Sequence, residues 1–329
     1  MYPLKFKGIY KERIWGGEKL ATEFGKKLPK STEPIGESWE ISGVEGDVSC
    51  VANGTLRGNS LNELIEIYMD ELVGDSVFKR FGEEFPLLIK LIDAQDNLSI
   101  QVHPDDELAA SRHNAYGKTE MWHIISAEEG AQIYLGFKED TTRERYIEYL
   151  NAGKLEELLN SYSVKAGETY FIPAGAIHAI GRGVLLAEIQ QTSDITYRVY
   201  DFNRLDSEGK ARELHTELAV DAISYEASDA YNVSVEPVKG EAVEIQSCKY
   251  FTSELRDVQG SVEIDLAKRD SFTIFICLEG SVEVLTSGND ESNNAPVSLS
   301  KGESILIGAC HPSVMLTGNA TLLGTYINH

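Results

Sequence analysis

Short apolar and β-branched runs separated by turn residues fill most of this chain, and this pattern limits it to a mainly β fold. In the first two-thirds, the predicted strands are 86–93, 98–102, 121–126, 131–136, 168–172, 185–191 and 197–200. After about residue 237 nearly every segment is a strand candidate, at 243–247, 250–255, 261–265, 271–278, 281–286, 296–299, 304–307, 314–317 and 321–326. The polar residues 288–294 are expected to form a loop tip.

Helical periodicity is confined to a few segments, which are 60–73, 142–162, 108–113 and 216–225. The first is the clearest, because Ser60 and Glu63 have the spacing of a capping box. The second is interrupted by Gly153. The acidic run at 105–107 is interpreted as the solvated start of a helix, where carboxylates complement the helix dipole.

The change from mixed to strand-only patterning places a domain boundary within 226–240. We therefore expect a first domain at 1–235 and a second at 236–329. A weak repeat links them, because KAGETYFIPA at 165–174 resembles KGESILIGA at 301–309. In each copy a Gly-Glu turn precedes a short apolar strand.

Composition and charge exclude several classes of protein. Lys and Arg number 30 against 53 Asp and Glu, and the formal net charge of -23 repels nucleic acid and anionic membranes. No apolar run approaches the ~18 residues of a membrane span, and no signal peptide is evident. The four cysteines form no CxxC pair, which argues against disulfides and thiolate zinc sites. A cytoplasmic protein is expected, and an anionic substrate would need a local basic pocket.

Three motifs carry ligand-type side chains. Gln101 and His103 are two apart on a predicted strand and share one face, although this segment alone favours a solvated sheet surface before a Pro turn. The segment GETYFIPAGAIH fits the spacing G(X)5PXG(X)2H, which is the second motif of the cupin superfamily and ends on His178. In GKTEMWH, Glu120 offers a carboxylate and Lys118 shares its strand face.

The sequence resembles class I mannose-6-phosphate isomerases of the short bacterial kind across about residues 5–225. The matching segments are 13–17, 36–42, 85–109, 117–125 and 171–202. The last third resembles the family only as a generic cupin domain. The resemblance implies two cupin-type domains (jelly-roll, or double-stranded β-helix) with small helical insertions at about 60–73 and 142–162.

The resemblance also implies functional residues. One zinc ion per chain would be bound by Gln101, His103, Glu120 and His178. Arg198 and Lys118 match catalytic positions, and the expected substrate or phosphate contacts are Ser99, Glu188 and Arg204. The group that carries the proton is Lys118, Glu188 or a metal-bound water, and the sequence does not choose among them. In the second domain, Ser313 stands at the position of His178, so no metal site is expected there.

The expected reaction interconverts D-mannose 6-phosphate and D-fructose 6-phosphate through a cis-enediol. A metal would polarise the sugar oxygens, and Arg198 would stabilise the enediolate. One alternative is another metal cupin, such as an iron dioxygenase that uses His103, His178 and Glu120. A second is a non-catalytic sugar-binding cupin. Co²⁺ and Mn²⁺ also suit these ligands. The expected partner is a small sugar phosphate, with no nucleic acid or membrane; the chain is either a monomer or a homodimer.

Overall fold

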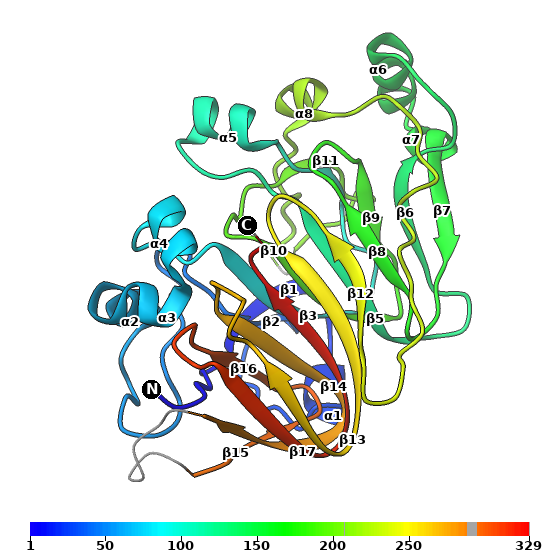
Figure 1. Ribbon diagram of the computed structural model, residues 1–329. Coiled ribbons are helices and arrows are strands. Elements are labelled where there is room, and N and C mark those ends of the chain that lie inside the picture. The colour runs from blue at the N-terminus through cyan, green and yellow to red at the C-terminus, as the bar shows by residue number, and fades with distance from the viewer. Residues whose placement is uncertain (207, 288–294, 329) are drawn as a thin grey trace.

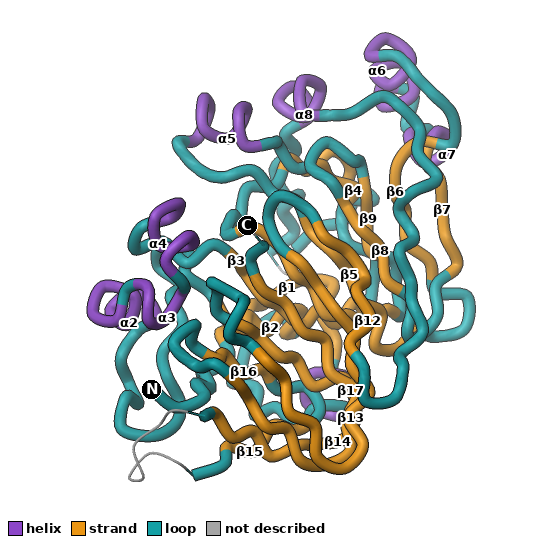
Figure 2. Tube along the Cα trace, viewed as in Figure 1, coloured by secondary structure: helices purple, strands orange, loops and turns teal. Residues whose placement is uncertain are grey.

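Three antiparallel sheets carry the chain, and the computed structural model describes residues 1–206, 208–287 and 295–328 (Figures 1 and 2). The first sheet has the order β1-β2-β3-β10-β5-β8. Its strands are β1 (Ile9–Gly17), β2 (Ile35–Ile41), β3 (Leu87–Ala94), β10 (Val184–Gln191), β5 (Glu120–Ala127) and β8 (Thr169–Ile172). The second sheet has the order β11-β4-β9-β6-β7. Its strands are β11 (Tyr197–Tyr200), β4 (Ile100–Val102), β9 (His178–Ile180), β6 (Gln132–Phe137) and β7 (Leu159–Ser163).

The third sheet is built from the C-terminal part of the chain, in the order β12-β13-β17-β14-β15, with β16 paired to β14. Its strands are β12 (Ala242–Ser247), β13 (Thr252–Asp265), β17 (Ser313–Tyr326), β14 (Thr273–Thr286), β15 (Val297–Ser300) and β16 (Ser304–Ile307). The prediction of a mainly β chain with small helical segments is confirmed. The predicted loop tip at 288–294 lies outside the described residues.

The helices are short and lie at the ends and edges of the sheets (Figure 1). They are α1 (Lys19–Thr22), α2 (Leu61–Tyr68), α3 (Asp70–Val73), α4 (Asp75–Phe81), α5 (Asp106–His113), α6 (Arg143–Asn151), α7 (Leu155–Leu158) and α8 (Thr216–Ala222). The Ser60–Glu63 capping box is confirmed, with both reciprocal bonds formed. The predicted helix 60–73 is split into α2 and α3, because Met69 adopts a positive φ of 47° between them. Among the described residues, no helix has the length and apolarity to cross a membrane.

The predicted helix at 142–162 is wrong in its second half. Gly153 has a φ of 67° and follows α6, and only the single turn of α7 comes after it. Residues 159–163 instead form β7, which pairs with β6 from Gln132↔Ser163 onward. Pairing to an available strand edge therefore overrides the helical spacing of the leucines in this segment.

The third sheet has longer strands than predicted. The segments expected as separate strands at 250–255 and 261–265 form one strand, β13, and β14 and β17 likewise merge two segments each. The glycines read as turns lie inside the ladder, where Gly260 pairs directly with Gly318. Their positive φ values of 86° and 148° are conformations that glycine tolerates without leaving the sheet. Strands β1 and β2 were not predicted, because glycines and charges interrupt their apolar pattern.

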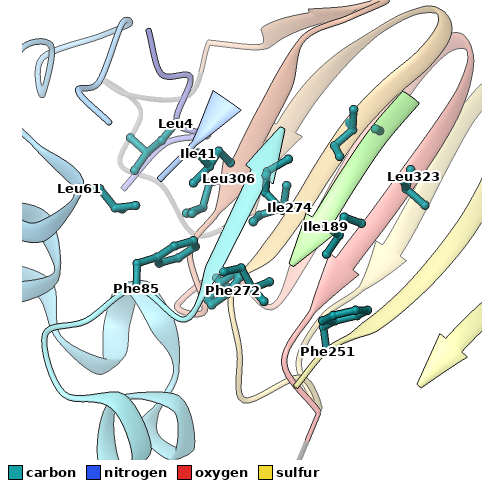
Figure 3. Packing of buried hydrophobic residues seen from close by; sticks show 14 of the residues in the cluster. Leu4, Ile41, Leu61, Phe85, Ile189, Phe251, Phe272, Ile274, Leu306 and Leu323 are labelled. Atoms are coloured by element: carbon teal, nitrogen blue, oxygen red, sulfur yellow. The ribbon is translucent and has the colours of Figure 1, made fainter. Parts of the chain in front are cut away.

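Apolar side chains from the first and third sheets meet in one core (Figure 3). Ile41 and Ile189 contribute from the first sheet, and Ile274 and Leu323 from the third. The N-terminus strengthens this contact, because Leu4 exchanges two backbone hydrogen bonds of 2.9 Å with Leu306. The C-terminal part of the chain is therefore packed directly on the back of the first sheet.

Strand β10 faces two ways, as a central strand must. Its odd residues Leu185, Ala187 and Ile189 belong to the core shared with the third sheet. Leu186 belongs to a different cluster between the first and second sheets. The even positions of β10 thus face a space enclosed by the first two sheets, and Glu188 lies on that side.

Candidate active site

The register of the second sheet brings three predicted residues together. Gln101 in β4 pairs with His178 in β9 on one side and with Arg198 in β11 on the other. The chain segments of these residues are far apart in sequence, yet their Cα atoms lie in one row across three strands. His103 follows Gln101 by two residues, just beyond the end of β4.

The facing side of the first sheet presents a second row. Glu188 in β10 pairs with Lys90 in β3 and with Trp122 in β5, and Glu120 in β5 pairs with Gln190. Glu120 and Trp122 are two residues apart and share a face. The site therefore lies between two sheets, with residues from each.

His103, Glu120 and His178 form a tight buried cluster. Oε1 of Glu120 is 3.3 Å from Nε2 of His103 and 3.2 Å from Nε2 of His178. The ligand atoms all lie within 4.8 Å of one another, and the three side chains are almost completely buried. Within the described residues, no other group of His, Cys, Asp and Glu side chains comes together in this way.

The far side of each imidazole fixes which nitrogen faces the cluster. Nδ1 of His103 lies 2.9 Å from the carbonyl oxygen of Ile195, and Nδ1 of His178 lies 2.8 Å from that of Ala176. A carbonyl only accepts, so Nδ1 donates in both residues. Nε2 of each ring therefore presents a lone pair to Glu120. Such outer hydrogen bonds are the usual way in which proteins orient metal-binding histidines.

The inner atoms of the cluster lack partners. His103 Nε2 and both carboxylate oxygens of Glu120 are buried without a hydrogen bond. Burial, with help from the nearby Lys118, lowers the pKa of His103 to about 3, so its ring is neutral. Burial opposes the charge of Glu120, but the nearby Lys118 ammonium favours the carboxylate, and the pKa of Glu120 is well below its usual range. Converging lone pairs with no proton between them fit a divalent cation.

Gln101 lies at the edge of this cluster. The nitrogen of its side-chain amide is 3.3 Å from Nε2 of His178. Its oxygen is 3.4 Å from the Ser99 hydroxyl. Because an amide can be turned over without changing its shape, Gln101 is able to present its oxygen to the same centre.

Buried charges continue from the cluster into the first sheet. Lys118 Nζ is 3.8 Å from Glu120 Oε2, and Lys90 Nζ is 2.8 Å from Glu188 Oε2. Burial, then Lys90, lowers the pKa of Lys118. Burial also opposes the charge on Lys90, but Glu188 and Glu37 outweigh it and raise its pKa. The two lysines therefore have opposite electrostatic surroundings.

A cavity of about 530 Å³ opens over these residues. It is lined by predicted residues from both sheets, namely Ser99, Gln101, Lys118, Glu188 and Arg198. Trp15 and Trp39 form part of its apolar wall. Its size and mixed lining suit a small polar molecule.

Guanidinium groups contribute to the lining of this cavity. Arg198, Arg212 and Arg13 all line it. Arg198 donates from Nη1 to the carbonyl oxygen of Glu213 at 2.8 Å, while its Nε is buried without a partner. Burial, then the neighbouring Arg212, lowers the pKa of Arg198. Unsatisfied donors under mutual repulsion favour an anion.

Arg204, a predicted phosphate contact, is directed elsewhere. It pairs with Asp201 at 2.6 Å and also bonds the carbonyl oxygen of Asn97, and it is not among the residues that line the cavity. Arg212 binds Asp201 from the other side through two bonds of 2.7 and 2.5 Å and does line the cavity.

Among the cavity residues that the sequence did not single out are Arg13, Lys90 and Arg212. Lys90 carried a signal, because it is the one charged residue inside the apolar run Leu87–Ile92. Arg13 and Arg212 carried none that distinguishes them from surface arginines.

Known proteins resemble this chain along most of its length. Residues 3–122 match the profile of the phosphomannose isomerase type I catalytic domain, and residues 241–327 match that of the mannose-6-phosphate isomerase cupin domain. A mannose-6-phosphate isomerase of Bacillus subtilis is 37% identical over 289 residues, covering 86% of this chain and 88% of its own. A Streptococcus mutans mannose-6-phosphate isomerase is 40% identical over 263 residues, covering 80% and 81%.

A solved structure shows the same arrangement of the chain. The crystal structure of the mannose 6-phosphate isomerase from Bacillus subtilis superimposes with a TM-score of 0.88 at 36% identity. The match covers 99% of this chain and 100% of that one. The predicted cupin-type architecture is thereby confirmed.

Proposed function

The chain belongs to the type I phosphomannose isomerase family, and on that premise we propose that it interconverts D-mannose 6-phosphate and D-fructose 6-phosphate. The observation that carries the proposal is the buried cluster of His103, Glu120 and His178, in which the carboxylate oxygens lack hydrogen bonds. Its neighbours Gln101 and Lys118 line a cavity to which three arginines also contribute. A metal-assisted reaction on an anionic small molecule fits both features.

The resident metal in this proposal is one zinc ion, held by His103, Glu120, His178 and the amide oxygen of Gln101. Two imidazoles and one carboxylate are ligands that zinc accepts readily, and thiolates are not needed. When bound, zinc supplies Lewis-acid polarisation of the sugar oxygens. Because imidazole and carboxylate also bind iron, the same triad keeps an iron dioxygenase as the second candidate function.

The reaction proposed here is a proton transfer along the open-chain sugar. A proton leaves C2 and returns at C1, while the proton of the C2 hydroxyl moves to the C1 oxygen, and a cis-enediol lies between. Lys118 and Glu188 are the cavity side chains placed to carry a proton. Arg198, next to Gln101 in the sheet, stabilises negative charge on the enediolate oxygens.

The phosphate of the substrate would bind to arginines that line the cavity. Arg212 has its Nε and Nη2 engaged by Asp201, which leaves Nη1 for an anion. Arg13 is held by Glu37 through Nε at 2.7 Å, and Ser99 adds a hydroxyl on the same wall. Charge-assisted bonds of this kind are the strong ones in phosphate recognition. In this proposal Arg204 acts by holding Asp201, not by touching phosphate.

The two-part organisation of the chain follows from the same premise. We propose that residues 1–235, including the short helices near 60–73 and 142–158, form the catalytic unit. Residues 236–329 form a second cupin-type unit, which uses no metal of its own. A reducing cytoplasm suits the four cysteines, all of which are free thiols.

Removal of the metal should abolish turnover reversibly. Chelator-treated protein is expected to lose isomerase activity in a coupled assay on mannose 6-phosphate, and added zinc should restore it as one ion per chain binds. Activity is expected to be indifferent to oxygen and reductant, because zinc has no redox chemistry. If the protein binds a full complement of zinc but shows no turnover, the isomerase proposal is rejected. Oxygen consumption by the iron-loaded protein would then favour the dioxygenase.

Arg212→Met should weaken substrate binding more than turnover. Loss of one charge-assisted bond to phosphate, worth ~1.5–3 kcal/mol, corresponds to a rise in KM of about 10- to 100-fold. The inhibition constant of inorganic phosphate as a competitive inhibitor should rise in parallel. Arg145→Met is the matched control, because Arg145 pairs with Glu139 on the exposed face of α6. An unchanged KM and phosphate inhibition constant would remove Arg212 from the phosphate site.

A further inference from the structure

Asp106 joins the active-site segment to the C-terminal sheet. Its Oδ1 accepts from the backbone N–H of Gly117 at 3.2 Å and from Nε2 of Gln191 at 2.9 Å. Its Oδ2 accepts from Nζ of Lys249 at 3.0 Å and from the hydroxyl of Tyr250 at 2.8 Å. All four partners are donors, so only a carboxylate satisfies both sides at once. This is more than the solvated helix start expected from the sequence.

The first pair of partners fixes the segment that leads into Glu120. Gln191, whose side chain is held by Asp106, accepts from the N–H of Thr119 through Oε1 at 2.8 Å and donates its own N–H to the Thr119 carbonyl at 3.1 Å. The next amide back, that of Lys118, donates to the carbonyl oxygen of Pro104 at 3.1 Å. Every peptide unit between Gly117 and Glu120 is thus tied to the Asp106 side of the cavity or to β10.

The fit at Gly117 is close enough to transmit small displacements. A Cβ atom there would lie 2.5 Å from the backbone nitrogen of Asp106 and 2.6 Å from the carbonyl carbon of Asp105. Real Cβ atoms do not approach so closely, so the two backbones are in direct contact. A shift of the Asp106 region therefore moves the segment that carries Lys118 and Glu120.

The second pair of partners belongs to the third sheet. Lys249 and Tyr250 form the connection between β12 and β13. The Lys249 contact is an exposed ion pair and contributes little by itself. The Tyr250 hydroxyl bond is less exposed, and burial together with Asp106 raises the pKa of Tyr250. Tyr250 is consequently the stronger of the two contacts from the C-terminal part.

We infer that Asp106 and Tyr250 are positioning residues, through which the C-terminal sheet sets the position of Lys118 and Glu120. This inference rests on the proposed function, because it assigns a task to the second domain within that reaction. Neither residue touches the substrate. Their effect is on where the proton-carrying and metal-binding side chains stand.

The test combines turnover with hydrogen exchange of residues 114–122. In Tyr250→Phe, which keeps the ring and loses the hydroxyl, we expect kcat to fall ~3- to 10-fold at unchanged zinc content. In Asp106→Asn the fall should be about 10- to 100-fold, as for other supports of metal ligands. Amide exchange at Gly117 and Thr119 should quicken in both. The double variant should be no slower than Asp106→Asn alone, because Tyr250 acts through Asp106.

Lys5→Met is the matched control. Lys5 also links the N-terminal part to the C-terminal part, through an ion pair of 2.7 Å with Glu303, but it is not among the residues that line the cavity. It should change neither exchange at 114–122 nor kcat. The inference is overturned if Tyr250→Phe leaves exchange or turnover as in the wild type, or if Lys5→Met matches its effect. A wild-type protein without isomerase activity would refute the proposed function separately, and unchanged exchange in Tyr250→Phe would still refute the inference.

Discussion

His178→Ala is expected to lose bound zinc and isomerase activity together. The imidazole is buried, its Nδ1 is fixed by the Ala176 carbonyl, and its Nε2 lies 3.2 Å from Glu120. Without it, the remaining ligands no longer enclose a cation. Loss of several kcal/mol of Lewis-acid stabilisation corresponds to at least about 10³-fold in kcat. Zinc content by elemental analysis and the coupled assay should fall in proportion.

The control for this change is another buried histidine. His311 in the C-terminal part donates from Nδ1 to the Ser287 carbonyl oxygen at 2.9 Å. Among the described residues, no other histidine or carboxylate is grouped with it. His311→Gln should retain one zinc per chain and near-normal turnover. Full zinc occupancy in His178→Ala would contradict the ligand role, and zinc loss in His311→Gln would point to a second site.

Arg198→Ala should separate chemistry from metal binding. The guanidinium is half-buried, and its Nε is a buried donor without a hydrogen-bond partner. Such a donor is available to bind a negatively charged oxygen of the reacting sugar. If it stabilises the enediolate, its loss should lower kcat by about 10²- to 10³-fold, the range for a single oxyanion-stabilising donor. Zinc content should not change, because Arg198 is no ligand. A comparable fall in kcat and kcat/KM would mark an interaction made mainly in the transition state.

The matched variant is Arg112→Ala, which removes an arginine of similar partial exposure that pairs with Asp221 outside the cavity. It should leave kcat within about twofold of the wild type, as surface substitutions usually do. Arg198→Lys should recover part of the lost rate, since the charge returns without the planar fork. An Arg198→Ala enzyme with normal kcat would exclude Arg198 from the mechanism.

Residues held together by local motifs were predictable from the sequence. His178 ends a cupin motif and was predicted from a short window. The spacing of Gln101 and His103 suggested a shared face, but the prediction of both as ligands depended on the family resemblance. The structure brings these residues to one cluster with Glu120. Their chemical roles stay predictions until the variants above are measured.

Residues that reach the site only through long-range pairing could not be placed there from the sequence. Lys90 stands out as the one charge in an apolar run, but its position opposite Glu188 depends on the register of β3 and β10, which no local pattern reveals. Arg212 enters through its two bonds to Asp201, and Arg13 through Glu37. The predicted strand boundaries in the third sheet were wrong for a related reason. A glycine in the middle of a strand pair has the same local sequence pattern as a glycine in a turn.

The two faces of β10 restrict how this enzyme family member can change over evolution. A slip of one residue in that strand would turn Glu188 toward the third sheet and bring Ala187 or Ile189 into the cavity. The apolar contacts of Leu185, Ala187 and Ile189 with the core therefore fix the register of the strand, and with it the position of Glu188 in the cavity. Substitutions at Glu188 can change the reaction, while Leu185, Ala187 and Ile189 must stay apolar to keep the core behind the strand. Within this eight-residue strand, neighbouring residues are thus constrained for different reasons, Ala187 and Ile189 by packing and Glu188 by the chemistry of the cavity.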